Sequence, residues 1–265
     1  MKKLSIFAVA LAALAFTACD GNKSAKTEDQ AAVKSFEQEQ VEAKIKMEID
    51  SLAAEIGKLK DLPIVQEGGA VKLTDQEKQV KPDYLLSAAV AENAATLAEK
   101  YRMLSALSVD KNIAALYGMP TDEYQTAIAK LVADIDDPSF KEVEDTASIF
   151  KAGQQLYTAM EKNGRINNYW QLVAASLVEE IYVMSQNSDK FITAFDDESA
   201  ANVSFRIVLI LDAINRLSEY DADIEPVAKA LAPLDVLNAT TVSELKTQLN
   251  EAKEPIENAR KALIQ

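Results

Sequence analysis

The sequence predicts an all-α protein, either a multi-helix bundle or a short α-solenoid, with a long helix near its N-terminus. Gly and Pro number only 7 each in 265 residues, where average usage would place them together at roughly 12%. Ala, Leu, Glu, Lys and Gln, which favour helices, are plentiful. Apolar residues recur three and four apart along most of the chain, which is the helical period. Cap residues and Gly or Pro divide that pattern into segments of helix length.

Residues 1–18 have the layout of a signal peptide. The chain begins with the cationic Met1-Lys2-Lys3 and continues with an uncharged apolar run from Leu4 to Phe16. This order is typical of a secretory signal. The run is shorter than the roughly 20 apolar residues that a membrane-spanning helix needs. We therefore expect the segment to direct export and to be removed.

The sequence Phe16-Thr17-Ala18-Cys19 resembles the lipobox of bacterial lipoproteins, and Cys19 is the only cysteine of the chain. In that family the cysteine becomes the mature N-terminus and carries diacylglycerol on its sulfur and an acyl chain such as palmitate on its amine. Phe16 stands where the family most often has leucine. The resemblance covers residues 1–19 only. It implies lipid attachment at Cys19 and a location in the cell envelope, anchored outside the cytoplasm on the periplasmic face or at the cell surface.

After the lipobox we expect a flexible tether over 19–29, because these residues are small and polar. A long amphipathic helix over 30–62 should follow, with an apolar seam at alternating spacings of four and three: Ile45, Ile49, Leu52, Ile56 and Leu59. Such a seam can pack on a partner helix as a coiled coil. It spans little more than two heptads and Gly57 interrupts it, which favours a helix that lies on its own domain.

Pro63 ends this helix, and residues 63–81 are interpreted as a linker that contains a capping box from Thr74 to Glu77. Residues 82–265 form the predicted α-helical domain. Start and stop signals place its helices near 82–107, 110–117, 121–136, 138–163, 169–185, 189–195, 199–220 and from 244 to the C-terminus, with an interruption at Pro255. The 138–163 helix is predicted to carry an apolar stripe of Phe140, Val143, Ala147 and Phe150.

Two stretches, Trp170–Val178 and Phe205–Leu211, are apolar on nearly all sides and should form the centre of the core. The domain also has a possible internal duplication with a period of about 80 residues, a spacing that suggests repeated helical units. Ala94–Glu99 aligns with Ala174–Glu179, and Asp110–Leu116 aligns with Asp189–Phe195. Either the chain has two similar helical halves, or alanine-rich helices match by chance.

Composition excludes several classes of function. The formal charge of −14, from 42 acidic and 28 basic residues, repels nucleic acid. The chain has no histidine, which removes the commonest general base and the commonest transition-metal ligand. With Cys19 lipidated, thiol chemistry and zinc–thiolate sites are removed as well. The sequence therefore predicts no catalytic residue, no metal site and no cofactor.

Three acidic clusters lie at predicted helix boundaries, where carboxylates cap free N–H groups and favour the positive end of the helix dipole. They are Asp134–Asp137, Asp196–Glu198 and Asp221–Glu225. The last has alternating oxygen ligands like a calcium loop, but it lacks the turn glycine and the distal glutamate. An enzyme that uses paired carboxylates alone would need two such acids in one cleft.

Charges inside apolar helices are the remaining candidates. Glu179 and Arg206 each interrupt an apolar stretch, and Glu99 aligns with Glu179 in the possible repeat. Buried charges need partners, so we expect a Glu179–Arg206 ion pair or side chains that reach water. The alternative is a polar contact within a ligand groove, which Trp170 and Tyr182 would line unless they pack in the core.

The sequence is therefore interpreted as a non-enzymatic envelope lipoprotein. Its helical domain would bind a protein partner or act as a structural module, held at the membrane by the lipid on Cys19. The alternative is a binding protein for a small or hydrophobic ligand between two helical halves. A cavity lined by Trp170, Tyr182 and Arg206 would favour that alternative, whereas a solid core would favour the first.

Overall fold

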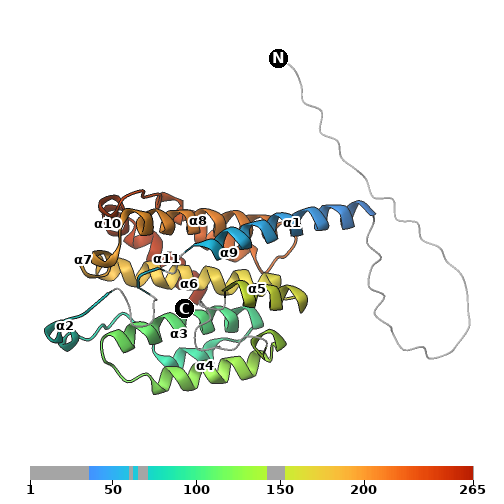
Figure 1. The fold of residues 1–265 in the computed structure, drawn as a ribbon. Coiled ribbons are helices and arrows are strands. Elements are labelled where there is room, and N and C mark those ends of the chain that lie inside the picture. The colour runs from blue at the N-terminus through green and yellow to red at the C-terminus, as the bar shows by residue number, and fades with distance from the viewer. Residues whose placement is uncertain (1–35, 60–61, 65–70, 142–152, 265) are drawn as a thin grey trace, which may run out of the picture.

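The computed structural model describes residues 36–59, 62–64, 71–141 and 153–264. All regular secondary structure in these residues is helical, and none of them lies in a strand, so the predicted all-α bundle is confirmed (Figure 1). The signal segment, Cys19, the tether and the predicted stripe residues Val143, Ala147 and Phe150 lie outside the described residues.

The described elements are α-helices joined by short loops and 3-10 turns. In chain order they are α1 (Phe36–Lys58), α2 (Asp75–Gln79), η1 (Ala88–Asn93), α3 (Leu97–Leu116), α4 (Asp122–Ile135), η2 (Pro138–Lys141), α5 (Gly153–Lys162), α6 (Ile166–Gln186), α7 (Ser188–Phe191), η4 (Ile192–Ala194), α8 (Asp197–Ser218), α9 (Glu225–Leu231), η5 (Ala232–Val236), α10 (Val242–Glu251) and α11 (Lys253–Ile264).

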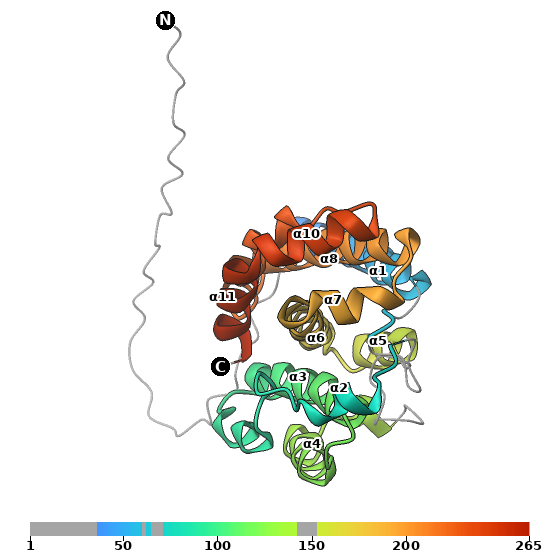
Figure 2. The same cartoon turned by 90° about the vertical axis from the view of Figure 1, so that its left-hand side faces the viewer.

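Helix α6 runs through the centre of the bundle. It packs against α3 on one side, with α4 behind α3, and against α8 on another side, with α1 beside α8; α11 lies along α6 and also contacts α3 (Figure 2). Trp170, Ala174 and Val178 of α6 have no exposed surface. A helix that is apolar all round is stable only when other helices surround it. The prediction that Trp170–Val178 forms the centre of the core is therefore confirmed.

The prediction that Phe205–Leu211 also lies at the centre of the core is wrong. Ile207 and Ile210 of α8 are buried, but Phe205 is 45% exposed and Val208 57% exposed. Helix α8 lies on the outside of the bundle, so only one of its faces can be covered by α6, α9 and α1. Hydrophobicity alone did not distinguish a central helix from a peripheral one that carries exposed apolar residues.

Helix α1 lies on its own domain, as the sequence favoured. Ile49, Ala53 and Ile56 are buried, and α1 contacts α8 and α5. Gly57 faces α5, where a Cβ atom at this position would lie 2.8 Å from Oε1 of the flexible Gln154 side chain. The remaining seam residues, Ile45, Leu52 and Leu59, are partly buried against the core.

The start of α3 differs from the expectation. The helix begins at Leu97 and not at Pro82, because Thr96 and Glu99 form a capping box. Thr96 Oγ1 accepts the Glu99 N–H at 3.2 Å, and Glu99 Oε2 accepts the Thr96 N–H at 2.8 Å. The helix then continues without a break through Asp110, where a new helix was predicted. It ends as predicted before Gly118, whose φ of 64° suits glycine.

The structure does not place the two aligned halves in equivalent positions. Ala94–Glu99 covers the loop and first turn of α3, whereas Ala174–Glu179 lies in the middle of α6. Asp110–Leu116 ends one long helix, whereas Asp189–Phe195 covers α7 and η4 beyond a break at Asn187. A single core cluster also extends from Ile49 to Ile264. The aligned segments therefore do not occupy equivalent places in their helices, and the internal duplication stays a prediction.

Part of the predicted linker belongs to the core. Ile64, Val71 and Leu73 are buried, and α2 starts at the predicted capping box of Thr74. At the other end of the chain, the helix break near Pro255 is present: α10 ends at Glu251 and α11 starts at Lys253. Pro255 thus lies in the first turn of α11, where its missing N–H is not needed. Helix α9 was not predicted.

Candidate functional site

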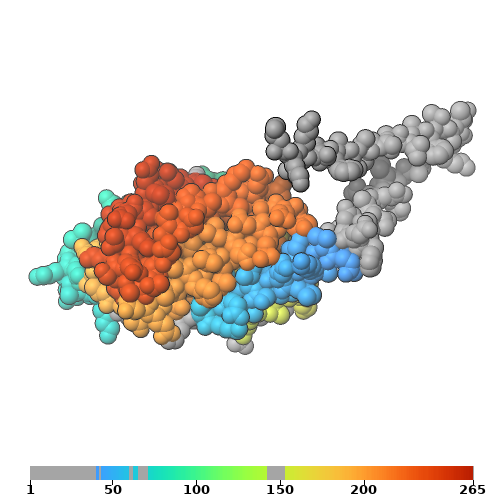
Figure 3. Space-filling model, turned by 90° about the horizontal axis from the view of Figure 1, so that it is seen from above, coloured from blue at the N-terminus to red at the C-terminus, as the bar shows by residue number. Residues whose placement is uncertain are grey.

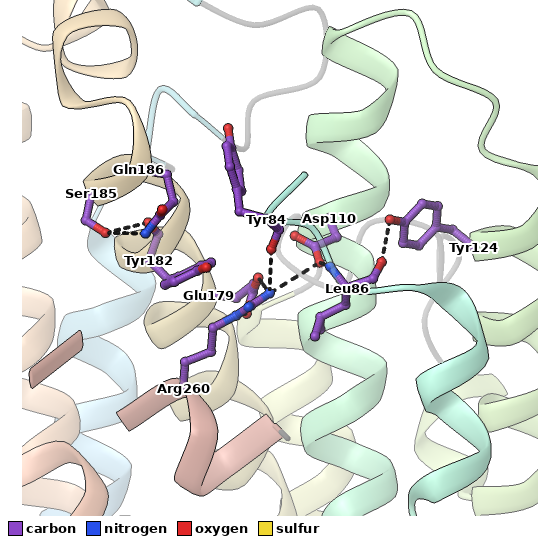
Figure 4. A network of polar contacts seen from close by, with 9 residues as sticks. All are labelled: Tyr84, Leu86, Asp110, Tyr124, Glu179, Tyr182, Ser185, Gln186 and Arg260. Atoms are coloured by element: carbon purple, nitrogen blue, oxygen red, sulfur yellow. Dashed lines mark hydrogen bonds and ion pairs between the residues drawn. The ribbon is translucent and has the colours of Figure 1, made fainter. Parts of the chain in front are cut away.

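A cluster of buried charges joins three helices at the centre of the molecule. Asp110 of α3 and Glu179 of α6 have no exposed surface, and Arg260 of α11 is 4% exposed. The guanidinium of Arg260 binds Glu179 with two hydrogen bonds, from Nε to Oε2 at 2.8 Å and from Nη2 to Oε1 at 2.7 Å (Figure 4). Such paired, charge-assisted bonds are strong and directional. Asp110 Oδ2 lies farther away, 3.9 Å from Arg260 Nη2.

The same cluster holds the loop that precedes η1. Arg260 Nη2 donates to the Tyr84 carbonyl at 3.2 Å, and Asp110 Oδ2 accepts the Leu86 N–H at 2.7 Å. The Leu86 carbonyl accepts the Tyr124 hydroxyl at 2.6 Å. These bonds satisfy buried backbone groups of a segment without regular structure, which would otherwise lose hydration without compensation. The cluster therefore ties α3, α4, α6 and α11 to one loop (Figure 4).

Burial changes how the two acids ionise. Loss of hydration, and then the negative charge of Glu179, raise the pKa of Asp110 well above its usual range. Burial also raises the pKa of Glu179, while the hydrogen bonds from Arg260 oppose that rise. Two acids in such close interaction titrate as a pair.

The predicted Glu179–Arg206 ion pair is wrong. Glu179 is paired with Arg260 instead, from a helix 81 residues further along the chain. Arg206 of α8 lines a separate pocket. The error arose because both residues interrupt apolar helices, whereas the true partner lies on an ordinary amphipathic helix. Arg260 does share the apolar face of Ile256, Ala259 and Leu263, and a cation on such a stripe was the signal available in the sequence.

Glu99, the third charge singled out, is not buried in the core. Its carboxylate caps the start of α3, and hydrogen bonds from the backbone of Thr96 lower its pKa. Asp110, which was predicted to start a helix, is the acid that does lie in the core. It directly follows the unbroken buried run from Leu104 to Val109, and this position within the helix distinguishes it from a cap residue.

Arg206 lines a pocket of about 260 Å³ between the end of α1, the start of α5, α6 and α8. Most of its wall is apolar, including Leu172, Leu177 and Ile210. Its polar members besides Arg206 are Gln154, Ser176, Glu180 and Tyr169. The Ser176 hydroxyl donates to Glu180 Oε1 at 2.8 Å. A mostly apolar wall with a few polar groups is the general form of a small-molecule site.

The other two predicted site residues do not line this pocket. Trp170 is fully buried and packs edge-to-face on Tyr169, with ring centroids 5.6 Å apart. Tyr182 places its ring 3.9 Å from Cζ of Arg260, a cation–π contact. The four predicted residues are thus distributed over three environments: Glu179 and Tyr182 at the buried cluster, Arg206 at the pocket and Trp170 in the apolar core.

The acidic clusters bind backbone N–H groups of their own loops and also groups of distant elements. Asp137 accepts the Tyr101 hydroxyl, Asp221 accepts the Asn167 amide, and Asp197 accepts the Val242 N–H at 2.9 Å. Asp196 caps α8 by accepting the Ser199 N–H at 2.8 Å, as the sequence predicted. Asp137 accepts the Ser139 N–H and Asp221 accepts the Asp223 N–H, each at 2.8 Å. Among the described residues, no group of three or more His, Cys, Asp or Glu side chains is arranged to hold a metal ion.

No helix of the described region is both long and apolar enough to cross a membrane. The sequence matches no protein-family model and no curated protein, and the fold matches no solved structure.

Proposed function

We propose that this chain is a non-enzymatic lipoprotein of the bacterial cell envelope, in which a lipid on Cys19 holds a helical protein-binding or structural module outside the cytoplasm. The observation that carries the proposal is the order of segments. A cationic and apolar signal ends in Phe16-Thr17-Ala18-Cys19, and a helical body with a continuous core begins with α1 at Phe36. A short polar stretch separates the two.

The positions of the acids support the non-enzymatic part of the proposal. Asp110 and Glu179 do come together, but neither has any exposed surface. A glycosidase needs both carboxyls at a cleft that the substrate enters. Their bonds to Leu86 and Arg260 instead give them a structural role.

Exposed apolar side chains on α1 and α8 support a protein-binding role. Met47 is 70% exposed and Val41 46% exposed on α1, and Phe205 and Val208 are exposed on α8. The two helices lie side by side on one face (Figure 3). Exposed apolar residues are common singly, and a partner that covers α1 and α8 together would bury all four of these side chains.

Cys19→Ala should release the protein from the membrane fraction. Two or more acyl chains provide stable attachment, and the polar residues after Cys19 have little apolar area to replace them. The measurement is labelling of cells with radioactive palmitate, followed by fractionation and mass spectrometry of the mature N-terminus. Cys19→Ser is a closer control in size and should behave like the alanine variant. A mature wild-type protein with an unmodified Cys19 thiol would contradict the proposal.

A second candidate, binding of a small amphipathic anion, is favoured by the pocket at Arg206. Its wall places the cation Arg206, together with the acid Glu180, among apolar side chains. The fluorescent anion 8-anilinonaphthalene-1-sulfonate is a suitable probe because it combines a sulfonate with aromatic rings. Arg206→Met should weaken its binding about tenfold, since a hydrogen bond to a charged group contributes about 1.5–3 kcal/mol and 1.4 kcal/mol corresponds to tenfold.

Arg216→Met is the matched control, because Arg216 lies on the same helix and pairs with Asp212 at 2.9 Å outside the pocket. It should leave the affinity unchanged. Equal affinities of the wild type and the Arg206→Met variant for the probe would exclude the pocket as the anion site. The protein-binding proposal would then be the one that remains.

A further inference from the structure

The buried cluster has an excess of acids. Asp110 and Glu179 would carry two negative charges, and Arg260 supplies one positive charge. All three side chains are shielded from water. Leaving a net charge in the interior is costly, and buried groups commonly change their protonation to avoid it. One bound proton would make the cluster neutral.

The hydrogen bonds indicate which acid holds the proton. Glu179 receives both short bonds from Arg260, which favour its charged form. Asp110 receives the Leu86 N–H on Oδ2, while Oδ1 is buried and has no hydrogen-bond partner in the part of the chain that the structure describes. An ionised carboxylate oxygen without a donor is unfavourable in the interior. A protonated Oδ1 could instead donate to the adjacent Glu179 carboxylate.

We propose that the Asp110–Glu179–Arg260 cluster binds one proton at neutral pH, carried by Asp110 and shared with Glu179, and that its loss at alkaline pH loosens α11 from α3 and α6. The cluster then works as a pH-sensitive clamp on the C-terminal helix. Only a proton moves, from the Asp110 carboxyl to hydroxide or solvent buffer, and the cluster gains one negative charge.

The other titratable groups around the cluster do not change charge between neutral and moderately alkaline pH. Burial raises the pKa of Tyr124 to about 12 and also raises the pKa of Tyr84 and Tyr182. These phenols therefore stay neutral. Glu257, the nearby acid of α11, is exposed and paired with Lys261 at 2.7 Å, and that pairing lowers its pKa. Asp110 is thus the group whose proton responds to alkaline pH.

The sign of the effect follows from the pKa of Asp110. Its pKa is about 3.9 in an unfolded chain and well above the usual range in the folded protein. At pH values below the pKa of Asp110 in the unfolded chain, the folded and unfolded states are both protonated, so the stability contributed by the protonated cluster is fully present. As pH rises between the two values, the folded state alone holds the proton, so stability falls. The folding equilibrium constant should decrease about tenfold per pH unit in that window.

The test compares the mature wild-type protein with Asp110→Asn by urea denaturation from pH 5 to 9. Asparagine keeps an acceptor for the Leu86 N–H and supplies a permanent N–H donor toward Glu179, so it imitates the protonated acid. The ratio of folding constants, variant to wild type, should rise with pH by tenfold or more. Asp189→Asn is the matched control, since Asp189 is an exposed acid paired with Lys246. It should not show that rise.

Two readouts test the proton and the clamp separately. Infrared spectra of the wild type at pH 7 should show a protonated carboxyl C=O stretch that is absent from Asp110→Asn. Carbon-13 labelling of aspartate would assign the band even if the variant did not fold. Hydrogen exchange of the amides in residues 253–264 should accelerate with pH more than the intrinsic exchange rate does. This extra acceleration should occur in the wild type and not in Asp110→Asn. Absence of the carboxyl band overturns the proton site, and uniform exchange behaviour overturns the clamp.

Discussion

Arg260→Met is expected to lower the free energy of unfolding by about 3–5 kcal/mol, the usual cost of removing one partner from a buried ion pair. The substitution leaves Asp110 and Glu179 facing each other without a cation and removes the bond to the Tyr84 carbonyl at 3.2 Å. Methionine fills most of the volume of the arginine stem, so the loss reports on charge more than on a cavity. Urea denaturation followed by far-UV circular dichroism measures it.

The loss should depend on pH. Without Arg260 both acids must be protonated to stay buried, and their folded pKa values therefore rise further above the unfolded values. The destabilisation should be smaller at pH 5 than at pH 8, because stability contributed by a raised pKa is lost as pH rises. A result independent of pH would show that the arginine acts through packing alone.

A double variant separates the pair from its surroundings. Glu179→Leu combined with Arg260→Met removes both strongly bonded charges and should recover much of the loss, since apolar replacements of buried pairs are often neutral or stabilising. The double-mutant cycle should therefore show strong coupling. Arg216→Met, at a partly exposed pair on α8, should have a small effect, as surface ion pairs do. Additive small losses would exclude a buried pair at Arg260.

Trp170→Ala is expected to have an effect of similar size, about 3–5 kcal/mol, because it removes a large side chain from the centre of the core and leaves a cavity. Trp170 has no exposed surface and packs edge-to-face on Tyr169. The surrounding helices are held by contacts of their own, so they cannot collapse fully into the space. Trp170 is the only tryptophan, so circular dichroism rather than fluorescence must follow unfolding.

Trp170→Phe is the control for the aromatic contact. It keeps a ring beside Tyr169 and removes the indole Nε1, which is buried without a hydrogen-bond partner among the described residues. The phenylalanine variant should thus lose clearly less stability than the alanine variant. Equal losses would mean that the indole N–H is bonded in solution, and a loss under about 1 kcal/mol for alanine would contradict the central position of α6.

Much of the fold could be predicted because its signals are local. The capping box at Thr74, the stop at Gly118 and the apolar seam of α1 depend on residues within one or two turns. The apolar character of α6 on all sides also placed it at the centre. Errors arose where local signals competed. Pro82 and Asp110 both resemble helix starts, but Pro82 lies before η1 outside any α-helix and Asp110 lies inside α3.

The candidate site was less predictable because its contacts are distant in the sequence. Nothing near Glu179 indicates that its partner is Arg260 rather than Arg206, since both are single cations on helices with apolar faces. The pairing depends on α11 lying against α6 and α3. Local patterns do not show that this C-terminal helix packs against α6 and α3, which are distant in the sequence. The buried loop at Leu86 was interpreted as part of a helix.

The sequence alone determined the helical class and most helix ends, because each depends on short-range backbone and side-chain chemistry, and the lipobox at Cys19 stays a prediction from the sequence. The tertiary structure decided which charges lie inside, with Asp110, Glu179 and Arg260 buried together and Glu99 at a helix cap. It also separated Arg206, at a pocket, from Trp170, in the core. The physical reason is that burial and charge pairing depend on how helices pack, and packing is a property of the whole chain.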